Sequence, residues 1–161
     1  MKKYLLLFLI LVPIFAFRPQ SPVIPSSENK QNCTYSDDEI LRLINLEREK
    51  VGVHPLVEDS FLSEVSLRRA EQQNGTMDRH VGFRQMIKDG VFNGRYSYVG
   101  ENLAGDGYSN DTCDSPEIYV YSWMISTEGH RETMLNPRYD EIGIGYYKSV
   151  VVTIFGDIKS D

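Results

Sequence analysis

Cysteine is scarce in this sequence, with only two residues among 161. So few cysteines exclude a small disulfide-stabilised scaffold and a four-cysteine zinc site. The chain also has no basic excess, because 17 Lys and Arg face 23 Asp and Glu and give a net charge of −6. An acidic protein is poorly suited to nucleic acid or to an anionic lipid surface, so neither is expected as the main partner. The length is that of one domain.

Outside residues 4–17 the chain lacks a long hydrophobic run. That run follows Met1-Lys2-Lys3 and is shorter than the roughly 20 apolar residues of a relaxed membrane span. The basic start, the short apolar stretch and the small Ala16 predict a secretory signal peptide over residues 1–16. An uncleaved N-terminal membrane anchor is the alternative. Cleavage would leave 15 Lys and Arg against 23 Asp and Glu, so the exported protein would carry a net charge of −8.

Residues 17–34 are rich in proline and serine and cannot form a core, which predicts a flexible tether. The folded domain is therefore expected over residues 35–157. Cys33 lies at the end of the tether and Cys113 lies in an acidic, turn-rich loop of the domain. On an exported chain this pair predicts a disulfide, with two free thiols as the alternative.

Helical patterns occupy the first part of the domain and strand patterns its end. Ser36 and Glu39 have the spacing of a capping box at the start of an amphipathic helix, with Arg48 on its polar face. The last two strands alternate in hydropathy around a turn at Lys148-Ser149, which predicts an antiparallel hairpin. The fold class is therefore α+β. Helices are expected over about 37–52, from Asp59 or Ser60 to 74, over 83–88, over 115–125 and from Ser126 or Thr127 to Leu135, and strands over 96–103, 142–146 and 150–155.

No serine lies in a G-x-S-x-G pattern that would indicate a hydrolase nucleophile, so the candidate site residues are histidines and glutamates. Histidine is also scarce. Of the three histidines, His54 stands beside a proline and is expected at the surface. His80 and His130 lie in polar segments, and their wide separation does not by itself indicate a metal site. Glu101 lies within an apolar extended run, where a carboxylate needs either solvent or a partner. Glu128 precedes a helix, whose dipole an acid stabilises.

These residues follow one another in a recognisable order. Gly100-Glu101-Asn102-Leu103-Ala104 precedes Trp123, Gly129-His130-Arg131 and Ile142-Gly143-Ile144-Gly145. The ordered set closely resembles the CAP superfamily of cysteine-rich secretory, antigen 5 and pathogenesis-related 1 proteins, in its compact prokaryote-type form. The resemblance covers about residues 37–155. It implies an α-β-α sandwich in which helices cover a small antiparallel sheet.

The resemblance also implies a surface cavity lined by two histidines and two glutamates, whose histidines can hold a divalent metal such as zinc. Carried over, the metal ligands are His80 and His130, and one glutamate is Glu101. Ser126 stands where the family has its second glutamate, and Glu128 is the candidate to replace it.

Three functions are compatible with these residues. The first is a secreted binding module whose cavity takes a divalent metal and an unidentified extracellular ligand, which could be a peptide, a glycan or a lipid. The second is a zinc-assisted hydrolase of peptide or cell-wall material in which Glu101 is the base. The third is a glycosidase that uses Glu101 and Glu128 as its two carboxylates.

Overall fold

The computed structural model describes residues 37–73, 75–105 and 114–158. The predicted signal peptide, the tether and both members of the Cys33–Cys113 pair lie outside these residues, as does Ser36. Within them the elements are α1 (Asp37–Lys50), β1 (Val57–Glu58), α2 (Ser60–Gln72), α3 (Val81–Lys88), β2 (Tyr96–Ala104), α4 (Pro116–Ile125), α5 (His130–Met134), β3 (Glu141–Tyr147) and β4 (Val150–Ile158).

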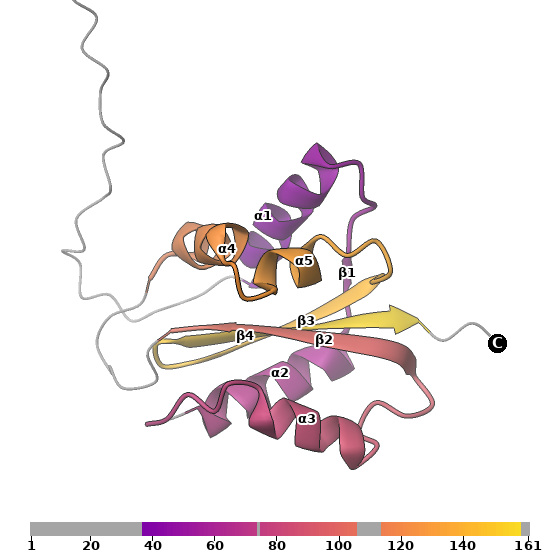
Figure 1. The fold of residues 1–161 in the computed structure, drawn as a ribbon, viewed down its shortest axis with the longest axis vertical. Coiled ribbons are helices and arrows are strands. Elements are labelled where there is room, and N and C mark those ends of the chain that lie inside the picture. Colours follow the sequence, from indigo (N-terminus) through magenta and orange to yellow (C-terminus); the bar gives the residue numbers. More distant parts are fainter. Residues whose placement is uncertain (1–36, 74, 106–113, 159–161) are drawn as a thin grey trace, which may run out of the picture.

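The fold is a three-layer α-β-α sandwich, which confirms the expected class. Helices α1, α4 and α5 cover one face of the sheet, and α2 and α3 cover the other (Figure 1). The strand order is β1-β3-β4-β2, so β2 lies at one edge of the sheet and β1 at the other. The predicted antiparallel arrangement holds for β2, β4 and β3. The two-residue β1 was not predicted, and it joins β3 in parallel, which makes the sheet mixed.

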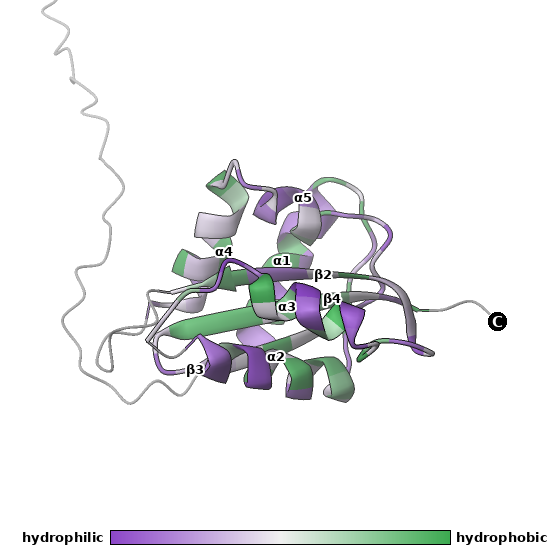
Figure 2. Ribbon diagram, turned by 60° about the horizontal axis from the view of Figure 1, so that its bottom comes forward, coloured by the Kyte–Doolittle hydropathy of each residue, from purple (hydrophilic) through white to green (hydrophobic). Residues whose placement is uncertain are grey.

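Alternation along the hairpin divides the interior into two hydrophobic cores. Ile142 and Ile144 of β3 pack among the α1 and α4 side chains, which include Trp123. Val152 and Ile154 of β4 pack among those of α2 and α3. Successive strand residues point to opposite faces, so one alternating hairpin supplies both cores. Figure 2 shows the hydrophobic residues along the central strands and a hydrophilic α5.

Two glycines of β3 allow α2 to lie unusually close to the sheet. A Cβ on Gly143 would collide with the backbone at Leu62, and a Cβ on Gly145 would collide with the backbone at Ser66. The close approach is used for bonding, since Ser66 Oγ donates to the carbonyl of Gly143 over 3.0 Å. The Ile-Gly-Ile-Gly motif thus gives β3 an apolar face toward α1 and α4 and a flat face toward α2.

The ends of the helices agree with the sequence in most places. Asp59 caps α2 through a bond from the N–H of Leu62, and Pro116 stands in the first turn of α4, as predicted. The predicted cap of α5 is wrong. That helix begins at His130 after Gly129, because Ser126 ends α4 and its hydroxyl binds the His130 ring instead.

Candidate functional site

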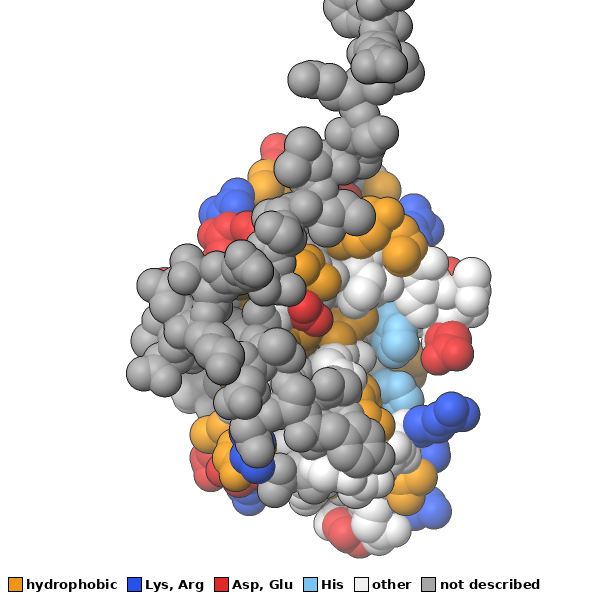
Figure 3. Space-filling model, turned by 90° about the vertical axis from the view of Figure 1, so that its left-hand side faces the viewer, with side chains coloured by type: hydrophobic (Ala, Val, Ile, Leu, Met, Phe, Trp, Pro, Cys, Tyr) orange, Lys and Arg blue, Asp and Glu red, His pale blue; other side chains and the backbone are white. Residues whose placement is uncertain are grey.

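The two candidate histidines meet at the β2 edge of the sheet, one from each helical layer. His80 is the residue before α3, and His130 is the first residue of α5. Their ring centroids are 6.0 Å apart, with 50° between the ring planes. Two histidine side chains are seen next to each other on the molecular surface in Figure 3. The fold therefore brings together two residues that the sequence separates by fifty positions.

His80 is held toward the sheet by an unusual backbone. Arg79 and His80 both have positive φ, 49° and 68°, a left-handed conformation that is uncommon for residues other than glycine. Asp78 fixes the turn from both sides. Its carboxylate accepts the N–H of Gly82 at 2.8 Å, and its own N–H donates to Gln73 Oε1 at 2.8 Å.

Glu101 lies between His80 and a buried arginine. Nδ1 of His80 is 2.7 Å from Oε2 of Glu101, and Nε of Arg69 donates to Oε1 at 2.8 Å. The side chains of Arg69 and Glu101 are both wholly buried, whereas that of His80 is 32% exposed. Because a carboxylate beside a guanidinium is ionised and only accepts, His80 donates its Nδ1–H to it. Nε2 of His80 is then the atom with a free lone pair.

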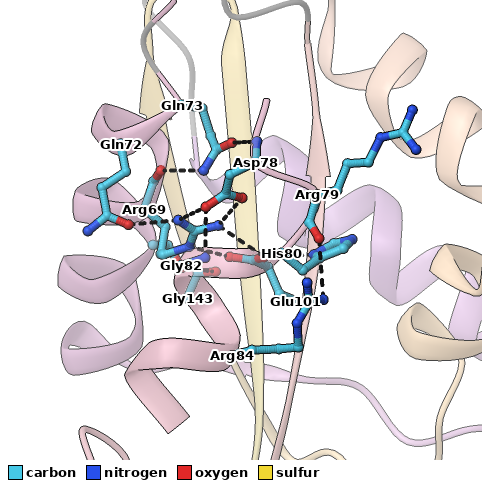
Figure 4. Close-up of polar contacts among 11 residues, drawn as sticks. Arg69, Gln72, Gln73, Asp78, Arg79, His80, Gly82, Arg84, Glu101 and Gly143 are labelled. Atoms are coloured by element: carbon cyan, nitrogen blue, oxygen red, sulfur yellow. Dashed lines mark hydrogen bonds and ion pairs between the residues drawn. The ribbon is translucent and has the colours of Figure 1, made fainter. Parts of the chain in front are cut away.

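Arg69 also reaches a second carboxylate, as Figure 4 shows. Its Nη2 donates to Oδ1 of Asp78 at 3.0 Å. Burial alone would raise the pKa of Asp78, but the bonds from Arg69 and from the Gly82 N–H outweigh it and lower that pKa. The absence of a side chain at Gly82 leaves room for this pairing, since a Cβ there would collide with Nη1 of Arg69.

His130 has a neutral partner instead. Its Nδ1 lies 2.8 Å from Oγ of Ser126, which also accepts the N–H of Glu128 at 3.1 Å. The carbonyl of His130 accepts a 2.9 Å bond from Nδ2 of Asn102, which ties α5 to β2. Burial lowers the pKa of His130, and the neighbouring His80 lowers it further. The ring is therefore held in its neutral form, the form that binds metals.

Glu128 stands in a different setting from Glu101. It is exposed, and its charge acts to raise the pKa of His130. With Trp123, Ile125 and Leu103 it lines a pocket of about 430 Å³ that also borders His130. The structure thus groups His80, Glu101 and His130 through direct contacts, and it places Glu128 at the wall of an adjoining pocket.

The donor set fits an open metal site formed by two imidazoles. Both Nδ1 atoms are occupied, by Glu101 and by Ser126, so the Nε2 atoms are the ones left for a metal. Among the described residues, no group of three or more His, Cys, Asp or Glu is arranged to hold an ion. A metal bound here would keep solvent in its remaining positions, as catalytic and exchangeable sites do.

Sequence reasoning missed the residues that support the histidines. Arg69 is the clearest case, although a signal was available. In α2 the buried positions are Leu62, Val65, Ser66, Arg69 and Ala70, so a charged residue stands within the apolar face of the helix. A buried charge is kept only where it is paired, so this position by itself indicates an acidic partner.

His54 was predicted at the surface, and its side chain is 47% exposed. It lies apart from the other two histidines, with Nε2 3.0 Å from the carbonyl of Tyr139. Within the described residues, no helix is both long and apolar enough to cross a membrane.

Comparisons with known proteins agree with the fold. The family model of the cysteine-rich secretory protein family, CAP, matches residues 41–152. The uncharacterized protein YkwD of Bacillus subtilis (strain 168) is 31% identical over 134 residues, which cover 78% of this chain and 51% of that protein. The uncharacterized membrane protein YlbC of the same organism is 30% identical over 118 residues, covering 72% and 33%. The chain therefore spans about half the length of one curated relative and a third of the other.

A similar solved structure is that of an extracellular protein containing a SCP domain from Bacillus anthracis. It superposes with a TM-score of 0.57 at 21% identity, over 76% of this chain and 40% of the other. At that identity the likeness establishes the fold alone.

Proposed function

Because this chain belongs to the cysteine-rich secretory protein (CAP) family, we propose that it is an extracellular binding module whose His80/His130 pair takes a divalent metal, zinc in the first instance. The observation that supports this most is the pairing of two imidazoles whose Nδ1 atoms are both occupied and whose rings are 6.0 Å apart. Imidazole nitrogens suit zinc and its neighbours in the first transition row. The Bacillus anthracis relative is an extracellular protein, and the predicted signal peptide would export this chain as well.

Glu101 serves this function as a positioning residue. Its carboxylate accepts the Nδ1–H of His80, which fixes the tautomer and leaves Nε2 with a free lone pair. Arg69 in turn fixes the carboxylate from behind. The same contacts argue against the hydrolase alternative in which Glu101 is the base, because both its oxygens already accept bonds and its side chain is wholly buried. They argue equally against a glycosidase that pairs Glu101 with Glu128.

Ser126 serves His130 in the way that Glu101 serves His80, although with a hydroxyl in place of a carboxylate. A hydroxyl holds the ring but adds no charge. With Ser126 in place of the family glutamate, His130 keeps a hydrogen-bond partner that orients its ring, but it lacks the negative charge that a carboxylate would add. Glu128 supplies part of that charge from an exposed position.

Zinc titration of three single variants tests the proposal. Zinc binding is measured by calorimetry and by elemental analysis of dialysed protein, for wild type, His80→Ala, His130→Ala and the matched control His54→Ala. We expect the first two variants to bind zinc at least about tenfold more weakly, and His54→Ala to bind like wild type. Equal zinc uptake by all four proteins, or none by wild type, would remove the metal from the proposal.

The same samples are then assayed for turnover of peptides and peptidoglycan. A binding module shows no turnover with or without zinc. Hydrolysis that depends on zinc and disappears in both site variants would establish the hydrolase in its place.

A further inference from the structure

Positive charge is concentrated in one segment of this acidic chain. Residues 79–95 contain one acidic residue, Asp89, and four basic residues: Arg79, Arg84, Lys88 and Arg95. The segment therefore has a net charge of +3 although the whole chain has −6, so all other residues together carry −9. It includes α3, which with α2 forms the helical layer on one face of the sheet (Figure 1).

Three of these cations form one exposed surface. Arg84 and Lys88 are four residues apart on α3, so their side chains lie on the same face of the helix. Nη1 of Arg84 donates to the carbonyl of Arg79 at 3.3 Å, which ties the preceding turn to that face. All three residues are exposed, and Figure 4 shows the Arg79 side chain extending away from the buried Arg69 and Glu101. Arg79, Arg84 and Lys88 are named the α3 basic surface.

The cations of the α3 basic surface lack the carboxylate partners that exposed cations have elsewhere. On other surfaces, four exposed cations each pair with a carboxylate over 2.6 to 2.9 Å: Arg42, Lys50, Arg68 and Arg138. Among the described residues, no carboxylate pairs with the three side chains of the α3 basic surface. The nearby Asp89 accepts from Gln85 instead. Because like charges four residues apart destabilise a helix, this surface gains free energy when an anionic group binds it.

Two apolar side chains are exposed on the same helix. Val81 is 58% exposed and Ile87 is 44% exposed, and each stands three residues from Arg84. The core contacts of α3 are made by Phe83 and Met86, so Val81 and Ile87 are available to a partner. Acidic groups together with apolar side chains are the composition of an acidic peptide, whereas a polysaccharide offers no such apolar groups.

The charge of the surrounding surface limits the size of the partner. Charges in solvent are screened beyond about 8 Å at physiological ionic strength. A short acidic segment on α3 therefore experiences mainly the local positive charge. An anionic membrane or a long anionic polymer would also approach negative side chains of the same helical layer, such as the exposed Glu64 and Glu71 of α2. The surface thus fits a short acidic ligand better than an extended one.

We propose that the α3 basic surface binds a short acidic peptide segment of a partner protein, whose carboxylates pair with Arg79, Arg84 and Lys88 and whose apolar side chains contact Val81 and Ile87. Two of the three cations are arginines, whose guanidinium groups hold carboxylates through two parallel bonds. The inference goes beyond the proposed metal function. Within the described part of the chain, no hydrogen bond joins these three side chains to either histidine of the site.

The first test changes the protein. The probe is a fluorescently labelled hexapeptide of four glutamates and two leucines, titrated against wild type, the double variant Arg84→Gln/Lys88→Gln and the control Arg42→Gln/Lys50→Gln, which removes the same charge from α1. We expect the α3 variant to bind the probe about tenfold more weakly, because two exposed ion pairs are lost, and the control to bind like wild type. Equal affinity of all three proteins, an equal loss in both variants or no binding to wild type would overturn the proposal.

A second test leaves the protein unaltered and changes the ligand. A matched hexapeptide with glutamine in place of glutamate should bind at least about tenfold more weakly, and the affinity of the acidic peptide should fall as salt is added. Equal binding of the two peptides would contradict the proposal. Tighter binding of an oligogalacturonate hexasaccharide, or of phosphatidylglycerol vesicles, would also overturn it, since the surface would then serve a glycan or a membrane.

Each titration is repeated with zinc and with a chelator. We expect the affinity for the acidic peptide to be the same in both, and the zinc affinity of Arg84→Gln/Lys88→Gln to equal that of wild type. A failure of peptide binding would therefore leave the metal function intact, and a failure of zinc binding would leave peptide binding intact. Peptide binding that required zinc would refute a separate surface on α3.

Discussion

Below the sheet, a buried arginine reaches His80 through a carboxylate, and above it another buried arginine reaches the helix of His130 through backbone carbonyls. Arg69 bonds to Glu101 and Asp78. Arg48 donates to the carbonyls of His54, Met134, Asn136 and Tyr139, over 2.8 to 3.0 Å. Both side chains are fully buried, and each fixes the segment that carries one histidine.

The difference is visible in the pKa values of the two guanidinium groups. Burial would lower the pKa of Arg69, but its two carboxylate partners outweigh it and raise that pKa. Burial lowers the pKa of Arg48, and only the more distant charge of Asp140 opposes the change. The lower half of the site, in which Arg69 supports His80, therefore depends on charge pairing. The upper half, in which Arg48 supports the helix of His130, depends on hydrogen bonds to backbone carbonyls. The two halves should respond differently when the arginine is removed.

The largest effect is expected for Arg69→Ala. Removal of this side chain leaves Glu101 without its cation at a fully buried site, which costs about 3–5 kcal/mol of unfolding free energy. The neighbouring Arg68→Ala is the matched control, because Arg68 pairs with Glu64 on the surface, with side chains 56% and 66% exposed. That pair contributes about 0–1 kcal/mol. Urea denaturation of both variants measures the difference, and a loss for Arg69→Ala no larger than the control's would refute the charge-pairing account of the lower half.

Arg48→Ala is expected to have a smaller effect. Its partners are neutral carbonyls, and leaving buried acceptors of this kind unpaired costs about 1–3 kcal/mol. Arg42→Ala is the control on the same helix, since Arg42 bonds only to the exposed Glu39 among the described residues. Zinc affinity is measured beside stability. We expect Arg48→Ala to weaken zinc binding, because Arg48 holds α5, which carries His130. A variant that is less stable but binds zinc with full affinity would show that Arg48 does not support the site.

This contrast also explains what could be predicted from the sequence. The α+β class, the hairpin and most helices follow from periodicity and from caps such as Asp59, because these signals are local. Arg48 was placed on the polar face of α1, and that prediction is wrong. Except for His54, its partners lie more than eighty residues away in the chain. No pattern in the sequence indicates a bond from a side chain to a distant backbone carbonyl.

The site itself was predictable to a similar degree. His80, Glu101 and His130 were identified through the family resemblance, and the fold places them in contact. The bond from Ser126 to His130 was not foreseen, because only the backbone turn between α4 and α5 brings a hydroxyl to a ring four residues on. β1 escaped prediction because two residues are too few to show alternation.

The smallest effect is expected in the upper half, in the titration of His130 without metal. Burial and His80 lower the pKa of this ring, while Glu128 and Glu132 act to raise it. Glu128→Gln removes one raising charge, so the pKa of His130 should fall further. Because the folded pKa lies below that of the unfolded chain, neutral His130 contributes stability that is present above about pH 6.5 and is lost as the pH falls through the folded pKa. Glu128→Gln should extend that loss to lower pH.

The measurement is the pH dependence of the His130 ring resonance by NMR in the presence of a chelator. Glu64→Gln on α2 is the control, and its His130 pKa should match that of wild type. Because Glu128 is exposed, salt screens its charge, and the difference between Glu128→Gln and wild type should shrink at high ionic strength. A His130 pKa that is unchanged in Glu128→Gln at low salt would mean that Glu128 gives the ring no electrostatic support. Ser126 would then be the residue that replaces the family glutamate through its bond to the ring, and Glu132 would be the carboxylate whose charge still acts on His130.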